Sequence, residues 1–209
     1  MMYIISNIYI IVSLLLLCII TISIGNKVNF KATRKIIRNL SDSNIKHESF
    51  IQWFDKPIRQ LEILKLNPGI QSVEAIGTNK YRGYLSPIQF PGVSIMSRVD
   101  FDTSFDGKRL EVNCFDDSLV QDFQGSKILI SLISKLLPKI QSSNILTINN
   151  DNYLINEATL NICFDLPNWF PFNRNTLEKQ GSIAIGNNID KDLNELLDRI
   201  IETYKKLNN

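Results

Sequence analysis

The sequence has one histidine, His47, in 209 residues, and it contains no C-x-x-C motif. Because His47 precedes the body of the chain, the body lacks the side chain on which Ser-His-Asp, Cys-His and histidine-metal sites depend. Without paired cysteines, zinc-ribbon and thioredoxin-type chemistry also lack support. We therefore expect no metal, no cofactor and no catalysis, and we predict that His47 is a solvated linker residue.

Cysteine is also scarce, with three residues: Cys18 in an apolar N-terminal run and Cys114 and Cys163 in predicted strands. The last two could form a disulfide only if their strands are neighbours with suitable geometry. Cysteine packs as a small hydrophobic side chain in strands. We therefore expect two buried free thiols.

Acidic residues are absent from residues 1–41, which carry five bases, whereas the remaining residues carry 18 bases and 21 acids. The body thus has no basic excess with which to neutralise phosphates, and we expect no nucleic-acid partner. The uneven charge also marks residues 1–41 as a unit separate from the body.

Residues 3–24 form an uncharged run of 22 residues, long enough to span a bilayer. Three interpretations stay open: a signal peptide cleaved after Gly25, a single-pass membrane anchor with a basic flank, or the first part of a two-part presequence for a complex plastid. All three place residues 1–45 outside the fold. We predict a signal peptide or transmembrane anchor over 1–25, a basic transit-like linker over 26–46 and a folded domain over 47–209. The predicted location is a plastid or a membrane.

The first part of the body predicts short elements. SFIQWF (49–54) is typical of a strand, and an apolar face after Pro57 predicts a helix that ends at Asn67-Pro68-Gly69. Two further strands are expected over 71–77 and 80–88.

The clearest pattern lies over 93–105, where odd positions are mostly apolar and even positions are polar. This alternation predicts a long strand with one buried face. Asp106-Gly107 predicts a type I′ hairpin turn, and 108–115 then returns with Leu110, Val112 and Cys114 on one face.

The last third of the chain predicts another strand and a long helix. Residues 153–166 alternate, whereas 126–138 suits a helix or a strand equally well. Asn175 and Glu178 have capping-box spacing, and apolar residues at three-to-four-residue spacing follow from Ile185 to Leu207. Together these elements predict an α+β helix-grip fold, in which a curved antiparallel sheet wraps round a long C-terminal helix behind the apolar leader.

Three stretches carry a resemblance to a known family: YRGYLSPIQFPGVSIMSRVDFDTSF, NICFDLPNWFPFNRNTLEKQGSIAIGNNI and LLDRIIETYKKL. Residues 50–207 resemble the START-like (SRPBCC) superfamily, and within it an uncharacterised family of cyanobacterial and plastid proteins. The shared features are Asp165-Leu166-Pro167, an aromatic corner from Trp169 to Phe172, and Gly181 in the helix that follows. The resemblance implies the helix-grip fold and a plastid, and it implies no activity.

The order of the predicted elements, which is that of a helix-grip fold, and the resemblance together suggest non-catalytic binding of an apolar small molecule: a lipid, a pigment or an isoprenoid. The alternative is a membrane-tethered scaffold or assembly factor with a filled core. The membrane is a further predicted partner if residues 3–24 are retained. The candidate ligand-binding residues are Val99, Phe101, Leu160, Ile162, Phe164, Trp169, Phe172, Ile185, Ile189 and Leu193. Gly181 and Gly186 indicate either a flexible helix entry or close packing of helix on sheet.

Overall fold

The structure is a computed structural model. It describes residues 24–208 apart from 57, 86, 91–92, 116–118, 128–129, 131–138 and 168–172. Side chains at 24–26, 88–90, 93, 119, 164 and 166–167 are also left undescribed. The elements are β1 (Ile24–Asn39), the 3-10 helix η1 (Leu40–Ser43), α2 (His47–Phe54), α3 (Ile58–Lys65), β2 (Ile70–Gly77), β3 (Lys80–Leu85), β4 (Ile88–Phe90), β5 (Val93–Phe105), β6 (Arg109–Cys114), β7 (Leu119–Gly125), β8 (Lys139–Ile148), β9 (Tyr153–Pro167) and α5 (Arg174–Asn208).

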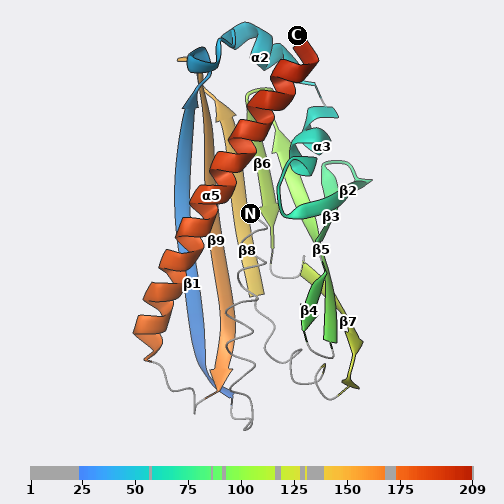
Figure 1. Ribbon diagram of the computed structural model, residues 1–209, viewed down its shortest axis with the longest axis vertical. Helices are drawn as coiled ribbons and strands as arrows, with labels where there is room; N and C mark the ends of the chain where they lie inside the picture. The colour runs from blue at the N-terminus through green and yellow to red at the C-terminus, as the bar shows by residue number, and fades with distance from the viewer. Residues whose placement is uncertain are drawn as a thin grey trace.

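All the strands form one antiparallel sheet, in the order β1-β9-β8-β6-β5-β3-β2, while β4 and β7 pair with the first half of β5. Figure 1 shows α5 running diagonally across this sheet, close to β1. The short helices α2 and α3 lie near the C-terminal end of α5. The tertiary contacts of α5 fall mainly on β1 and β9. The predicted α+β helix-grip architecture is confirmed.

The two strands with the clearest alternation form as predicted. In β5 the odd positions from Ile95 to Thr103 are buried, and the even positions are half-buried or exposed. In β9 the even positions from Leu154 to Ile162 are buried in the same way. Both strands have one face against the core, so the two-residue period of a strand appears directly in their sequences.

The prediction that residues 26–46 form a linker outside the fold is wrong. β1 pairs with β9 from Ile24↔Pro167 to Asn39↔Tyr153, and its residues Val28, Phe30 and Ala32 are buried. Three of the bases that suggested a linker, Lys27, Lys31 and Lys35, lie on the exposed face of β1. Arg34 and Arg38 lie on the same face as the buried residues, where they pair with acids of α5. The folded domain therefore includes β1.

The apolar run predicted as a signal or anchor lies outside the described residues, except for Ile24. Among the helices that are described, none has the length and apolar character needed to cross a bilayer. The three interpretations of residues 1–25 therefore stay predictions.

The strand predicted for 49–54 is wrong, because these residues belong to α2. Phe50, Trp53 and Phe54 are buried, at the spacing of one helix face. Trp53 also packs under the guanidinium of Arg59, 5.0 Å from its ring centre. His47 begins α2 and is half-buried, so its prediction as a solvated linker residue is also wrong.

The β5–β6 hairpin forms, but the predicted type I′ turn does not. Asp106, Gly107 and Lys108 connect the strands, and of these only Gly107 has a positive φ, of 90°. The Asp106 carboxylate accepts hydrogen bonds from the backbone N–H groups of Lys108 and Arg109, which lowers its pKa. The side chain of Asp106 therefore organises the turn without a left-handed backbone at its own position.

The long C-terminal helix forms with a different cap from the one predicted. Asn173 caps α5, because its side-chain oxygen accepts from the N–H groups of Asn175 and Thr176. The apolar row predicted for this helix is buried from Ile185 to Tyr204, but Leu207 is 57% exposed. In the ambiguous segment 126–138, Lys127 and Ile130 are helical, and most of the remainder lies outside the described residues.

Candidate functional site

The space between the sheet and α5 contains every described side chain of the predicted binding set. Each is at most 2% exposed and belongs to one hydrophobic core. Phe164 lies in β9 with an undescribed side chain, and Trp169 and Phe172 lie outside the described residues. The residues thus brought together are Val99, Phe101, Leu160, Ile162, Ile185, Ile189 and Leu193.

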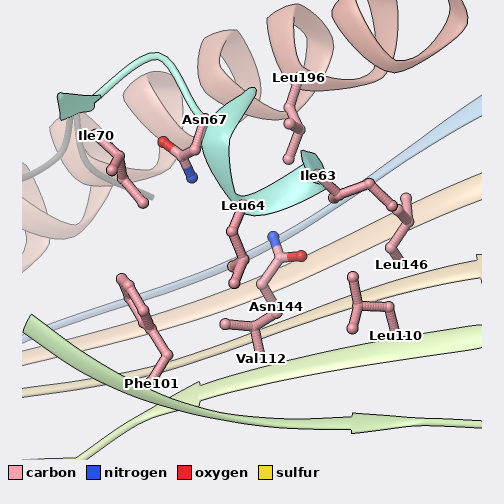
Figure 2. Close-up of a pocket in the computed structure, with 10 residues that line it drawn as sticks. All are labelled: Ile63, Leu64, Asn67, Ile70, Phe101, Leu110, Val112, Asn144, Leu146 and Leu196. Carbon is pink, nitrogen blue, oxygen red and sulfur yellow. The ribbon is translucent and has the colours of Figure 1, made fainter. Parts of the chain in front are cut away.

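A cavity of about 30 Å³ lies at the α3 end of this interior. We call it the α3 cavity, and Figure 2 shows its walls, which come from α3 and the loop after it, the inner faces of β5, β6 and β8, and α5. Phe101 is the member of the predicted binding set that lines it. The lining residues are Ile63, Leu64, Asn67, Ile70, Phe101, Leu110, Val112, Asn144, Leu146 and Leu196.

Two amides are the polar side chains of this otherwise apolar lining. Asn67 belongs to the loop after α3, and its side-chain oxygen accepts from the N–H of Gly69 at 3.2 Å. Asn144 stands on the inner face of β8, and Figure 2 shows its amide directed toward the α3 side of the cavity. The lining can therefore accept an apolar molecule and hydrogen-bond to one polar group on it.

Asn156 adds a second amide to the inner face of the sheet. It is completely buried, and neither its side-chain nitrogen nor its oxygen has a hydrogen-bond partner among the described residues. It pairs with Leu146 while Asn144 pairs with Ala158, so the two amides are diagonal neighbours on the inner face of the sheet. An unsatisfied buried amide costs about 1–3 kcal/mol, so a bound water or ligand is its usual explanation.

The buried face of α5 carries an acid, Asp192, which is 1% exposed. Burial raises the pKa of Asp192, and the nearby Glu195 raises it further. The sequence prediction missed both Asp192 and Asn156. The available signal was that each one interrupts an apolar row, between Ile189 and Leu193 in α5 and between Leu154 and Ala158 in β9.

A polar seam along the edge of β1 holds α5 over the interior. The N–H of Asn29 donates to the Glu178 carboxylate at 3.0 Å, and the N–H of Lys31 donates to the Ser182 hydroxyl at 3.1 Å. The bond from Asn29 lowers the pKa of Glu178. These helix side chains satisfy backbone donors that an edge strand would otherwise present to solvent.

The seam continues through two arginines of β1. Arg34 pairs with Asp190 at 3.0 Å, and Arg38 bonds to Asn194 and to Asp198, the latter at 3.3 Å. Glu178, Ser182, Asp190, Asn194 and Asp198 share one row of α5, since they are separated by four residues or a multiple of four.

Two glycines let the helix approach β1 closely. A Cβ on Gly181 would lie 2.5–2.7 Å from the ring of Phe30, and a Cβ on Gly186 would overlap the guanidinium of Arg34. Of the two interpretations of these glycines, close packing of helix on sheet is therefore confirmed.

Other reactive groups lie away from the α3 cavity. Cys114 is buried and Cys163 is half-buried, and both are free thiols, so the pair predicted to be buried is half confirmed. Within the described residues, no three His, Cys, Asp or Glu side chains gather in a way that could hold a metal ion.

No family model and no curated protein matches the chain. Among solved structures, it is similar to the ZhuI aromatase/cyclase from Streptomyces sp. R1128, at 6% identity and a TM-score of 0.46 over 87% of this chain and 96% of that one. A START superfamily protein from Mycobacterium smegmatis matches at 8% identity and a TM-score of 0.42, over 85% and 98%. A truncated norcoclaurine synthase from Thalictrum flavum matches at 10% identity and a TM-score of 0.41, over 88% and 97%. Likeness at this distance carries no statement about ligand or activity.

Proposed function

We propose that the chain binds a small apolar molecule with one polar group, a lipid, pigment or isoprenoid, between the sheet and α5, and does not transform it. The observation that carries this proposal is the interior itself. Apolar side chains of β5, β9 and α5 face one another there, and the buried amide of Asn156 has no hydrogen-bond partner among the described residues. An apolar interior with few polar groups is the usual composition of a small-molecule site.

The amides argue for a ligand that is not a pure hydrocarbon. A hydroxyl or carbonyl group placed beside Asn144 and Asn156 would supply the donor or acceptor that Asn156 lacks. A hydrocarbon would leave that amide unsatisfied and would gain nothing from it. We therefore expect the polar end of the ligand at the level of β8 and β9 where these amides lie.

The size of the α3 cavity implies that α3 moves when the ligand binds. About 30 Å³ holds one or two water molecules, whereas ligand pockets enclose roughly 300–1,000 Å³. The cover is small: α3 has eight residues, buries Gln60, Ile63 and Leu64, and leaves Ile58 55% exposed. Its end is tied to α5 by the bond from Arg199 to the carbonyl of Leu66, at 3.1 Å.

The cost of moving this cover is moderate. Exposing two aliphatic side chains costs about 1.5–3 kcal/mol each. An apolar ligand that takes their place against β5 and β6 recovers a comparable amount by burying its own surface.

The composition of the α3 cavity favours binding over catalysis. Its lining consists of hydrophobic side chains and the amides of Asn67 and Asn144. It includes no carboxylate, thiol or imidazole to act as nucleophile or general base.

The experiment is native mass spectrometry of the full chain, purified from a host rich in lipids and pigments, followed by organic extraction. The wild-type protein should carry an apolar adduct. Val112→Phe, which fills the α3 cavity, should lose it, whereas Val120→Phe, on the exposed face of β7, should keep it. Asn156→Leu should bind more weakly without losing stability, because it removes an unsatisfied buried amide.

Two outcomes would contradict the proposal. A wild-type protein that stays free of adduct after incubation with lipid extract would show that the interior does not open. An adduct that survives Val112→Phe would place the molecule elsewhere, for example on the apolar run 3–24.

A further inference from the structure

The sheet divides where β6 ends. The β6–β8 ladder stops at Cys114↔Ser142, and β7 then follows β5, while β8 stays with β9 as far as Lys139↔Cys163. Figure 1 shows β7 and the corresponding end of β8 apart from each other. Among the described residues, β8 before Ser142 therefore has a strand on one side only.

An open hollow of about 350 Å³ lies at this division. We call it the outer hollow, because most of its lining alternates with the buried positions of the same strands and so faces away from α5. Its volume lies in the range of small-ligand pockets. The lining residues are Lys31, Asn113, Cys114, Phe115, Gln141, Ser142, Ser143, Thr159 and Asn161.

The polar side chains of the outer hollow form two rows across the sheet. One row runs from Asn113 through Ser143 to Thr159, and the other from Gln141 through Asn161 to Lys31. The two rows are two residues apart along β8 and β9, or about 7 Å, so one small molecule can contact both rows. Amides and hydroxyls both donate and accept, which suits a ligand with several hydroxyl groups.

Lys31 gives the outer hollow a positive charge, and no described acid stands opposite it in the strand register. β1 carries three lysines on this face, and Lys27 is paired in register with Asp165 and Lys35 with Glu157. Lys31 is paired instead with Asn161, and the described residues give it no ion pair. None of the residues that line the hollow is an acid. The hollow should therefore attract an anionic group.

Two further side chains favour a hydroxylated ligand over a bare anion. The Asn161 amide lines the hollow, and its oxygen, which is shielded from solvent, has no hydrogen-bond partner among the described residues. A turn of this amide toward the hollow would let the oxygen accept from a ligand hydroxyl. Phe115 is 52% exposed at the hollow and offers an apolar surface to the C–H face of a ring. Asn113 is held in place by donating to Glu111 at 3.1 Å.

We propose that the outer hollow is a second binding site, separate from the interior, for a small hydroxylated anion with the chemistry of a sugar phosphate. Lys31 binds the anionic group. Asn161 and the two polar rows bind the hydroxyls, and Phe115 lies against the ring.

The test is isothermal titration calorimetry of the full chain with glucose 6-phosphate, glucose and inorganic phosphate as separate probes. Glucose 6-phosphate should bind more tightly than either other probe. Lys31→Gln should weaken it about tenfold, the loss expected for one charge-assisted hydrogen bond. Lys35→Gln is the matched control, because it removes the same charge four residues along the same face, opposite Glu157. Its affinity should stay at the wild-type value.

Each contrary result overturns the proposal. No measurable binding of glucose 6-phosphate would exclude the site. Equal affinity for inorganic phosphate would mean that the hydroxyl groups of the ligand contribute nothing to binding. Equal losses of affinity in Lys31→Gln and Lys35→Gln would mean that binding depends on the general positive charge of β1 and not on Lys31. Val112→Phe should leave glucose 6-phosphate binding intact, which separates this proposal from the one for the interior.

Discussion

Two of the strand edges of the sheet differ in what lies beside them, one along β1 and the other along β8 before Ser142. On β1, backbone donors at Asn29 and Lys31 are bonded to side chains of α5. On β8, the ladder with β6 ends at Ser142, and an open polar hollow lies beside the break. The first edge is covered by the protein's own helix, whereas among the described residues no second strand pairs with the other edge.

The two edges therefore differ in role: the seam has a structural role, and the outer hollow is the proposed binding site. Polar groups on the seam of α5 with β1 are paired with one another, so their contribution is to position the helix over the interior. Polar groups at the outer hollow include a lysine without an opposing acid and an amide oxygen without a partner among the described residues. Unpaired groups of this kind are the ones from which binding energy can be obtained.

The largest expected effect compares one phenylalanine from each region. Phe30→Ala should lower the free energy of unfolding by about 3–5 kcal/mol, because Phe30 is 1% exposed and packs on Gly181. Phe115→Ala should change it by less than about 0.5 kcal/mol, because Phe115 is 52% exposed. Urea denaturation of the full chain followed by circular dichroism measures both. Equally small effects would mean that β1 is dispensable to the fold.

That comparison also bears on what the sequence could predict. The alternation of β5 and β9 and the apolar row of α5 were recognisable because each element has one face against the core. β1 has the same alternation over Val28, Phe30 and Ala32, but the absence of acids from residues 1–41 suggested a targeting segment instead. In the prediction, the composition of residues 1–41 thus outweighed the two-residue alternation that identifies β1 as a strand.

The buried positions of the interior were predictable in part for the same reason. Inward-facing residues follow from alternation, so the described members of the predicted set do lie together. The α3 cavity was missed because the placement of α3 over β5, β6 and β8 is a tertiary contact that periodicity does not encode. The outer hollow was missed because it depends on where β6 ends relative to β8.

A second prediction tests whether the seam is equally rigid along its length. Gly181→Ala should destabilise the protein by up to about 2 kcal/mol, since overpacking against buried Phe30 costs about 1–3 kcal/mol and the helix gains about 1 kcal/mol from alanine. Gly186→Ala should leave stability unchanged or raise it by up to about 1 kcal/mol. Its neighbour Arg34 is a flexible, partly exposed side chain whose ion pair is worth little. Thermal and urea unfolding of both variants would show the opposite signs. Equal destabilisation would mean that Arg34 is as fixed as Phe30.

The smallest expected effect concerns the charge at the start of the seam. The Asn29 N–H lowers the pKa of Glu178 below its usual 4.5. A carboxyl whose pKa is lower in the folded state stabilises the fold above its unfolded pKa, and this stabilisation is lost as pH falls through the folded pKa. Glu178→Gln should therefore cost about 1 kcal/mol at pH 7, and this cost should disappear as the pH falls through the lowered pKa of Glu178.

The matched control for this charge is Glu202→Gln, which removes an exposed carboxylate from the same helix. Its unfolding free energy, measured by urea denaturation over the same pH range, should differ from that of the wild type by a small and nearly constant amount. If Glu178→Gln behaved in the same way, the Glu178 carboxylate would contribute no more than any surface charge. The edge of β1 would then depend on Ser182, Arg34 and Arg38 for its attachment to α5.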